Sequence, residues 1–385
     1  MTSTAIDLYN LSPVLRLMLM GIVIAIGPLI WVWLRSRHMP SARRLRLLTL
    51  LTLFLTFDLV VFGAFTRLTD SGLGCPDWPG CYGHASPIGA LSQIDLAEEA
   101  LPSGAVTRSK AWIEMIHRYL ATAVGVLILT LTITTWLERR RTQISPWWPV
   151  ATLVWVCLQG AFGALTVTMK LFPAIVTLHL LGGMALLALL KIQALRYAQA
   201  LGEQAVVAVP RSVRVLVLAT FALLWVQIAL GGWVSTNYAV LACTSFPSCQ
   251  NSLWPAMNFS QGFTIWRELG TAGDGSYISF EALTAIHYVH RLSAYLLFAV
   301  AAGLYACLLR IRLLRPQAHW LAGLVVLQVA TGLGNVLLGW PLAAAVLHTA
   351  GAAALVVVLT GIVFSTESPF QSMREAKFPK SRMPA

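Results

Sequence analysis

The stretch Glu114-Met115-Ile116-His117-Arg118 decides how the rest of this sequence is interpreted. It places a carboxylate, an imidazole and a guanidinium at the start of a long apolar run, 111–136. Ionisable side chains are costly inside a bilayer, so three of them together indicate a functional site. On a helix, Glu114 and His117 are three residues apart and face the same way. A similar stretch, His287-Tyr288-Val289-His290-Arg291, opens a second apolar run.

The composition indicates an integral membrane protein. Of the 385 residues, 57% are hydrophobic and only 11% are charged, whereas soluble domains carry about 25% charged residues. A membrane-spanning helix needs about 20 apolar residues. The alternation of an outer-membrane barrel is absent, so we expect an all-α fold. The nine expected spans are 14–34, 47–66, 112–136, 147–168, 173–197, 213–237, 283–310, 318–338 and 342–365.

The net charge of +12 follows from basic loops, and we expect no nucleic-acid partner. The basic residues cluster in short segments that all fall on one side of a nine-span topology. The positive-inside rule makes that side cytoplasmic. The long loops 67–111 and 238–282 are then outside. The basic residues are Arg35, Arg37, Arg43, Arg44, Arg46, Arg139, Arg140, Arg141, Arg196, Arg211, Arg214, Arg310, Arg312 and Arg315, with Arg374, Lys377, Lys380 and Arg382 in the tail.

The first 15 residues carry neither a basic segment typical of signal peptides nor an arginine-rich transit sequence. We therefore expect 14–34 to be a retained span. A multi-pass protein of the bacterial cytoplasmic (inner) membrane is the simplest interpretation.

An internal repeat relates the two halves of the chain. Matching residues recur with an offset of 168 to 173 positions, and the drift fits insertions in the outer loops. The matching pairs are Cys75 and Cys243, Cys81 and Cys249, His117-Arg118 and His290-Arg291, Leu158-Gln159 and Leu327-Gln328, and His179 and His348.

Each half contains four expected helices, an even number, so both halves insert with the same orientation. This predicts two parallel-repeat four-helix bundles related by a pseudo-two-fold axis along the membrane normal. The expected divisions are an extra N-terminal helix with its basic loop (1–46), an N-terminal half (47–197), a linker (198–212), a C-terminal half (213–365) and a basic tail (366–385).

Four histidines lie at one expected depth, six to eight residues in from the outer end of a span, or about 9–12 Å. They are His117, His179, His290 and His348. An isolated buried histidine bonded to a carbonyl is the alternative for each alone, but matched pairs favour a bundle-core cofactor. Two axial imidazoles in apolar surroundings suit heme iron. No Cys-x-x-Cys-His motif occurs, so covalent attachment of heme is not expected.

The two halves differ at one position, where Glu114 corresponds to His287. A buried carboxylate can serve in proton transfer or electrostatic stabilisation, which suggests that the reaction occurs in the first half. The alternative for Glu114 is a hydrogen-bonding residue at the helix entry. His287 is expected beside the cofactor rather than as an additional ligand.

Three other polar positions leave two interpretations open. Arg118 and Arg291 either pair with heme propionates or extend to the outer membrane interface. Asp58 lies in the middle of a span and is either a proton-relay group or a neutral, helix-bonded residue.

The outer loops share Cys-x5-Cys spacing, at Cys75 and Cys81 and again at Cys243 and Cys249. Both pairs are expected on the oxidising side of the membrane, where disulfides persist. They are interpreted as structural clips or, for the first pair, as a redox relay to a nearby cofactor.

The motifs that carry most information are Phe65-Thr66-Arg67-Leu68-Thr69-Asp70-Ser71-Gly72-Leu73-Gly74-Cys75-Pro76-Asp77-Trp78-Pro79, Glu114-x-x-His117-Arg118, His179, His290-Arg291 and His348. Their combination resembles the heme A synthase family over about 47–365. Members of that family oxidise the C8 methyl of heme O to the formyl of heme A for cytochrome oxidase assembly. The extra span at 14–34 departs from the family core of eight.

The resemblance implies a role for each motif residue. It implies that His290 and His348 bind a resident heme b, and that His117 and His179 flank the iron of the substrate heme O. Glu114 would be the catalytic carboxylate, and Cys75 and Cys81 functional cysteines. The expected partners are a heme O synthase that supplies the substrate, an electron donor, the lipid bilayer and, through small-residue helix faces, further copies of the chain.

Two other classes of protein remain as alternatives. A di-heme b-type quinol oxidoreductase explains four histidines without Glu114, but transmembrane electron transfer favours hemes toward both faces. A parallel-repeat transporter explains Asp58 but gives the paired histidines no role.

Overall fold

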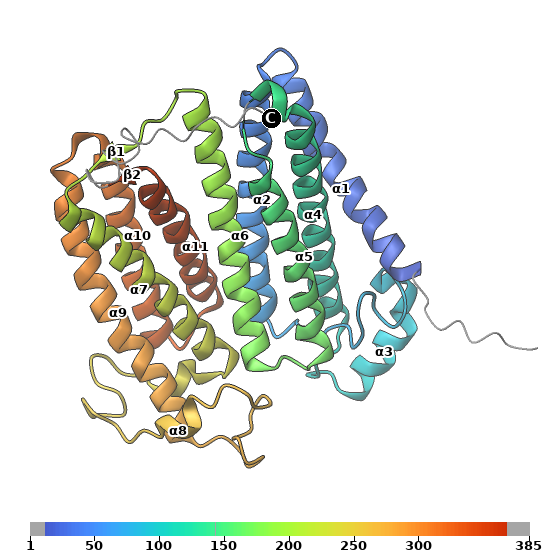
Figure 1. Cartoon of the computed structure of the whole chain (residues 1–385). Helices are drawn as coiled ribbons and strands as arrows, with labels where there is room; N and C mark the ends of the chain where they lie inside the picture. Colours follow the sequence, from blue (N-terminus) through green and yellow to red (C-terminus); the bar gives the residue numbers. More distant parts are fainter. Residues whose placement is uncertain (1–11, 143, 368–385) are drawn as a thin grey trace, which may run out of the picture.

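The computed structural model describes residues 12–142 and 144–367, and within them the protein is an all-α membrane protein (Figure 1). The basic tail residues Arg374, Lys377, Lys380 and Arg382 lie outside the described residues, as do 1–11. The helices are α1 (Ser12–Ser36), α2 (Ser41–Leu68), α3 (Leu91–Ala100), α4 (Arg108–Thr142), α5 (Trp147–Thr168), α6 (Pro173–Ala200), α7 (Arg211–Thr236), α8 (Phe259–Gly262), α9 (Phe280–Leu309), α10 (Arg315–Leu337) and α11 (Leu342–Phe364). Two short strands are β1 (Val207–Ala208) and β2 (Thr366–Glu367), and 3-10 turns occur at Pro87–Ala90, Ala239–Ala242 and Arg312–Leu314.

The nine expected spans are confirmed as helices. Among the described residues, nine helices are long and apolar enough to cross a membrane. They extend beyond the apolar runs, most clearly in α4, whose 35 residues include polar turns at both ends. Lipid cannot form hydrogen bonds with the backbone, so each apolar run is helical, and a helix forms its own backbone hydrogen bonds. The adjoining polar residues extend the same helix.

Two sets of four helices pack with the same order of neighbours. In the first set α2 packs on α4 and α6, and α5 packs on α4 and α6; in the second, α7 packs on α9 and α11, and α10 packs on α9 and α11. Figure 1 shows the two sets side by side, with α3 and α8 of the outer loops at the same end. This arrangement agrees with the predicted parallel repeat.

The two bundles meet along α6 and α7 and along α2 and α11. Gly232 allows a close approach, because a Cβ atom there would lie 3.2 Å from Cγ2 of Thr177. At the C-terminal ends of α2 and α7, the Arg67 side chain donates to the carbonyl of Ser235 at 2.6 Å and lies over the ring of Tyr238. Small residues and a few polar contacts thus hold the bundles together without a hydrophobic driving force.

The extra helix α1 packs on α4 and α2, outside both bundles. A Cβ at Gly21 of α1 would lie 2.4 Å from Cγ2 of Thr122 on α4, so the two helices touch closely. At the opposite end from α3 and α8, β1 pairs in parallel with β2, with Val207 opposite Thr366. The expected linker is therefore tied to the residues that follow α11, a contact that the sequence did not predict.

Candidate heme site

The four histidines divide into one pair per bundle. His117 lies on α4 and His179 on α6, whereas His290 lies on α9 and His348 on α11. All four side chains are half-buried. His117 and His179 interact electrostatically, and so do His290 and His348, which places the members of each pair near one another.

Each histidine ring packs against a glycine of a neighbouring helix. A Cβ at each glycine would lie close to Cε1 of the ring: 3.0 Å from Gly63 to His117, 3.5 Å from Gly163 to His179, 2.9 Å from Gly231 to His290 and 3.4 Å from Gly332 to His348. The glycines follow the repeat, since Gly63 corresponds to Gly231 and Gly163 to Gly332. A Cβ at Gly63 or Gly231 would crowd the imidazole, whereas one at Gly163 or Gly332 would make an ordinary van der Waals contact with it.

This donor set fits a tetrapyrrole. Heme iron takes four ligands from the porphyrin, and histidines of the protein can supply the remaining ones. Each bundle supplies two histidines from different helices, with a glycine that leaves room for each ring. In the first bundle Nδ1 of His117 and Nδ1 of His179 are buried without a hydrogen-bond partner in the described chain. Buried polar atoms are usually paired, so these two rings lack a bond from the described chain that would fix their orientation.

Glu114 is held tightly at the outer end of α4. Its side chain is 4% exposed. One carboxylate oxygen accepts from Nη2 of Arg118 at 2.5 Å, and the other accepts from the backbone N–H of Cys75 at 2.8 Å. Glu114 is therefore a hydrogen-bonding residue near the start of α4, as one interpretation expected. It also joins the helix of His117 to the first cysteine loop, between Cys75 and Cys81.

Arg118 holds this cysteine loop in place. Its Nη1 donates to the carbonyls of Asp77, Pro79 and Gly80, at 3.1, 3.1 and 2.5 Å. Gly74 lets the loop lie directly on α4, because a Cβ there would lie 2.4 Å from the carbonyl carbon of Lys110.

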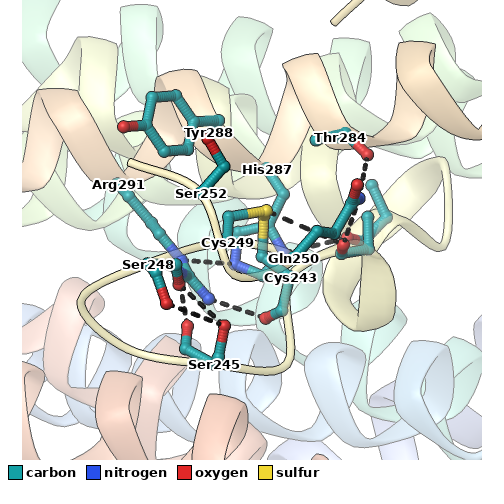
Figure 2. The surroundings of a disulfide bond; sticks show 12 residues. Cys243, Ser245, Ser248, Cys249, Gln250, Ser252, Thr284, His287, Tyr288 and Arg291 are labelled. Atoms are coloured by element: carbon teal, nitrogen blue, oxygen red, sulfur yellow. Dashed lines mark hydrogen bonds between the residues drawn. A yellow bond between two sulfur atoms is a disulfide. The ribbon is translucent and has the colours of Figure 1, made fainter. Parts of the chain in front are cut away.

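The second cysteine loop, between Cys243 and Cys249, is also anchored by an arginine. Figure 2 shows Arg291 directed into the loop between Cys243 and Cys249. The guanidinium donates to the carbonyls of Cys243, Ser245 and Ser248 at 2.6, 2.9 and 3.2 Å. Ser245 and Ser248 correspond in the repeat to Asp77 and Gly80 of the first loop.

These contacts give both arginines a role in anchoring the loops. Arg118 is 8% exposed and Arg291 is 7% exposed. Each guanidinium donates to carbonyls of its own loop, and pairing with heme propionates stays a prediction. A guanidinium suits this task because it presents several donors in a fixed plane.

His287 takes the place of Glu114 in the second bundle. Its Nδ1 lies 3.0 Å from the carbonyl of Ala239, and Nε of Arg291 lies 3.2 Å from its Nε2. His287 thus supports the second loop, and both of its ring nitrogens already have protein partners. This agrees with the expectation that it is not an additional ligand.

Both cysteine pairs form disulfides, as the spacing suggested. Cys75 pairs with Cys81 and Cys243 with Cys249. All four residues are at most 1% exposed. Thiol exchange needs access to a sulfur, so this burial favours the interpretation as structural clips over that of a redox relay.

A groove lies between α2 and α11, next to the first histidine pair. It has a volume of about 380 Å³ and is lined by Asp58, Val61, Phe62, Phe65 and Val346. The ring of Phe62 stacks beside that of His117, with centroids 6.3 Å apart. Asp58 is exposed in this groove. The groove is otherwise apolar, carries one carboxylate, and adjoins His117 through Phe62.

Sequence reasoning missed two kinds of residue at this site. The glycines Gly63 and Gly231 were not singled out, although the 168-residue offset relates them to each other as it relates the cysteines. Gln227 and Thr331, which contact His290 and His348, were also missed. They have no polar counterpart in the first half, so a search for repeated residues passes over them.

Comparison with known proteins identifies one family. The model of the COX15-CtaA family, described as cytochrome oxidase assembly protein, matches residues 46–360. This match covers most of both bundles and excludes α1.

Several curated proteins that resemble this chain are named heme A synthase. A protein named heme A synthase from Shewanella oneidensis is 37% identical over 316 residues, which are 81% of this chain and 93% of the relative. Proteins of the same name from Mesorhizobium japonicum and a Caulobacter species are 28% and 29% identical, over 82% of this chain and 88% and 94% of their own lengths.

Proposed function

Because the chain belongs to the heme A synthase family, we propose that it is an enzyme that oxidises the C8 methyl group of heme O to the formyl group of heme A. The product serves the assembly of cytochrome oxidase. In this proposal the enzyme is an oxidoreductase that acts on a C–H group and takes heme O from a heme O synthase.

The observation that carries the proposal is the arrangement of four histidines in two matched pairs, each ring against a glycine. We assign the pair His290 and His348 to a resident heme b and the pair His117 and His179 to the iron of heme O. The first bundle is assigned the substrate because α4 has a buried carboxylate, Glu114, where α9 has His287.

The chain's own residues have distinct tasks in this proposal. Bound heme b supplies an iron that can accept and donate electrons. Glu114, fixed by Arg118 and the Cys75 amide, provides a catalytic carboxylate whose position does not change as charge develops on the substrate. The first disulfide loop covers the outer end of α4. The groove beside Phe62 offers an apolar substrate a route from the bilayer.

The basic loops support a location in the bacterial cytoplasmic membrane. Arg43 and Arg46 lie at the start of α2, at the end opposite the disulfide loops. With that basic end in the cytoplasm, the disulfide loops face the oxidising side and the histidine pairs lie toward the outer face.

The proposal is tested by supplying heme O to cells or membranes that contain the protein and analysing extracted heme by mass spectrometry. We expect a formyl-bearing heme with the wild type and none with His117→Ala. If the wild type binds heme but leaves heme O unchanged when reductant and oxygen are present, an electron carrier is the better description.

A further inference from the structure

We propose that Gln227 and Thr331 are positioning residues that lock the axial histidines of the second bundle, whereas the first bundle is built without such locks. The second tetrapyrrole is then retained permanently and the first can exchange. This inference rests on the proposed function, because it concerns how one bundle keeps a cofactor and the other releases a product.

Thr331 determines which nitrogen of His348 carries the proton. Its hydroxyl oxygen lies 2.7 Å from the carbonyl oxygen of Leu327 and 2.9 Å from Nδ1 of His348. A hydroxyl has one proton, and the Leu327 carbonyl can only accept. The Thr331 oxygen must therefore accept from Nδ1–H of His348, which leaves the lone pair of Nε2 free for iron.

Gln227 lies beside the ring of His290. Its Nε2 is 3.1 Å from Nδ1 and 3.4 Å from Nε2 of the ring, and 3.2 Å from the backbone carbonyl of His290. Its Oε1 is buried and has no partner within the described residues. The amide oxygen and nitrogen of glutamine exchange places by a flip. After that flip, with the amide turned away from the His290 carbonyl, Oε1 accepts from Nδ1–H of His290, and the bond from Gln227 to that carbonyl is given up in exchange.

The first bundle has apolar residues at both positions. The repeat places Leu59 where the second bundle has Gln227, and Phe162 where it has Thr331. Nδ1 of His117 and Nδ1 of His179 accordingly have no partner among the described residues. The glycine contacts are present in both bundles, so the difference is confined to the hydrogen bonds of the rings.

This difference matches what the two bundles have to do. A hydrogen bond to the distal nitrogen of a ligating histidine fixes the ring and typically changes metal affinity about 10- to 100-fold. A resident cofactor gains from such a bond at both axial ligands. A substrate iron must be released as product in every cycle, and rings without a partner rotate away without breaking a bond.

The test compares heme loss from variants of the purified full-length protein. We choose Gln227→Leu, which copies Leu59 of the first bundle, Thr331→Val, which keeps the shape of the side chain, and both together. Heme b loss is followed by absorbance as heme transfers to apomyoglobin, and the low-spin electron paramagnetic resonance signal reports the axial rings. We expect about 10-fold faster loss for each variant and an altered signal.

Two controls separate hydrogen bonding from general loosening. Thr331→Ser keeps the hydroxyl and should retain heme as the wild type does. Thr220→Val removes a buried hydroxyl of α7 that bonds to the carbonyl of Leu216, away from His290, and should have no effect. In the converse experiment, Leu59→Gln should slow heme release from the first bundle.

The outcomes distinguish this inference from the proposed function. Wild-type protein that binds no heme contradicts the proposed function itself. Wild-type protein that binds heme b, with Gln227→Leu and Thr331→Val losing it at the wild-type rate and with an unchanged signal, overturns the inference and leaves the function standing. Faster loss in Thr331→Ser as well as Thr331→Val would show that packing, not the hydroxyl, retains the heme.

Discussion

Glu114→Ala should lower the rate of heme A formation by about two to three orders of magnitude, the usual effect of removing a preorganised electrostatic group. The change also leaves the Arg118 guanidinium buried without its carboxylate and the Cys75 amide without an acceptor. Breaking a buried ion pair in this way costs about 3–5 kcal/mol, so the first disulfide loop should loosen. Product is measured by mass spectrometry of extracted heme.

Two variants separate the contributions of Glu114. Glu114→Gln keeps an acceptor for Arg118 but removes the charge, so a loss of rate similar to Glu114→Ala would assign the effect to charge. Glu281→Ala removes an exposed carboxylate in the first turn of α9 and should leave the rate unchanged. Full activity of Glu114→Ala would remove Glu114 from the proposed reaction.

Replacing the histidine-facing glycines should abolish heme binding in one bundle at a time. In Gly231→Leu the new Cβ would lie 2.9 Å from Cε1 of His290, and the rest of the side chain fills the space of the ring. We expect at least 10-fold less heme b per protein, because displaced axial histidines no longer oppose each other. Gly63→Leu should leave heme b in place and eliminate conversion of heme O, because it displaces His117.

A matched control is available on α10. A Cβ at Gly323 meets no atom within 4 Å, so Gly323→Leu should retain heme and activity. Heme content is measured as Soret absorbance per protein, and activity as heme A formed. Normal heme b in a well-folded Gly231→Leu protein would contradict the assignment of His290 as a ligand.

Hydropathy and the repeat predicted most of the fold. The spans were identified because lipid requires continuous helical backbone, and the halves because His117, Cys75 and their counterparts recur at nearly constant spacing. The helix ends were missed by several residues, as in α4, because polar turns continue a helix without an apolar signal. The pairing of Val207 with Thr366 depends on the linker and the residues after α11 lying close together in space, and no local sequence pattern indicates it.

The site was predicted less completely than the fold. The four histidines and two disulfides were identified from residue type and spacing. The loop-anchoring contacts of the arginines were not predicted, because the sequence does not show that loop carbonyls converge on Arg118 and Arg291. The contact of Thr331 with His348 depends on which faces of α10 and α11 pack together. Both helices are largely apolar, so their sequences do not indicate those faces.

The central claim is that each bundle binds one tetrapyrrole through its own two histidines. The most direct measurement is the heme content of purified single-alanine variants of His117, His179, His290 and His348, determined after extraction and mass identification. We predict that His290→Ala and His348→Ala lose heme b, whereas His117→Ala and His179→Ala keep heme b and lose only heme O and heme A. Equal heme b content in all four variants, or its loss from His117→Ala as well, would contradict this account.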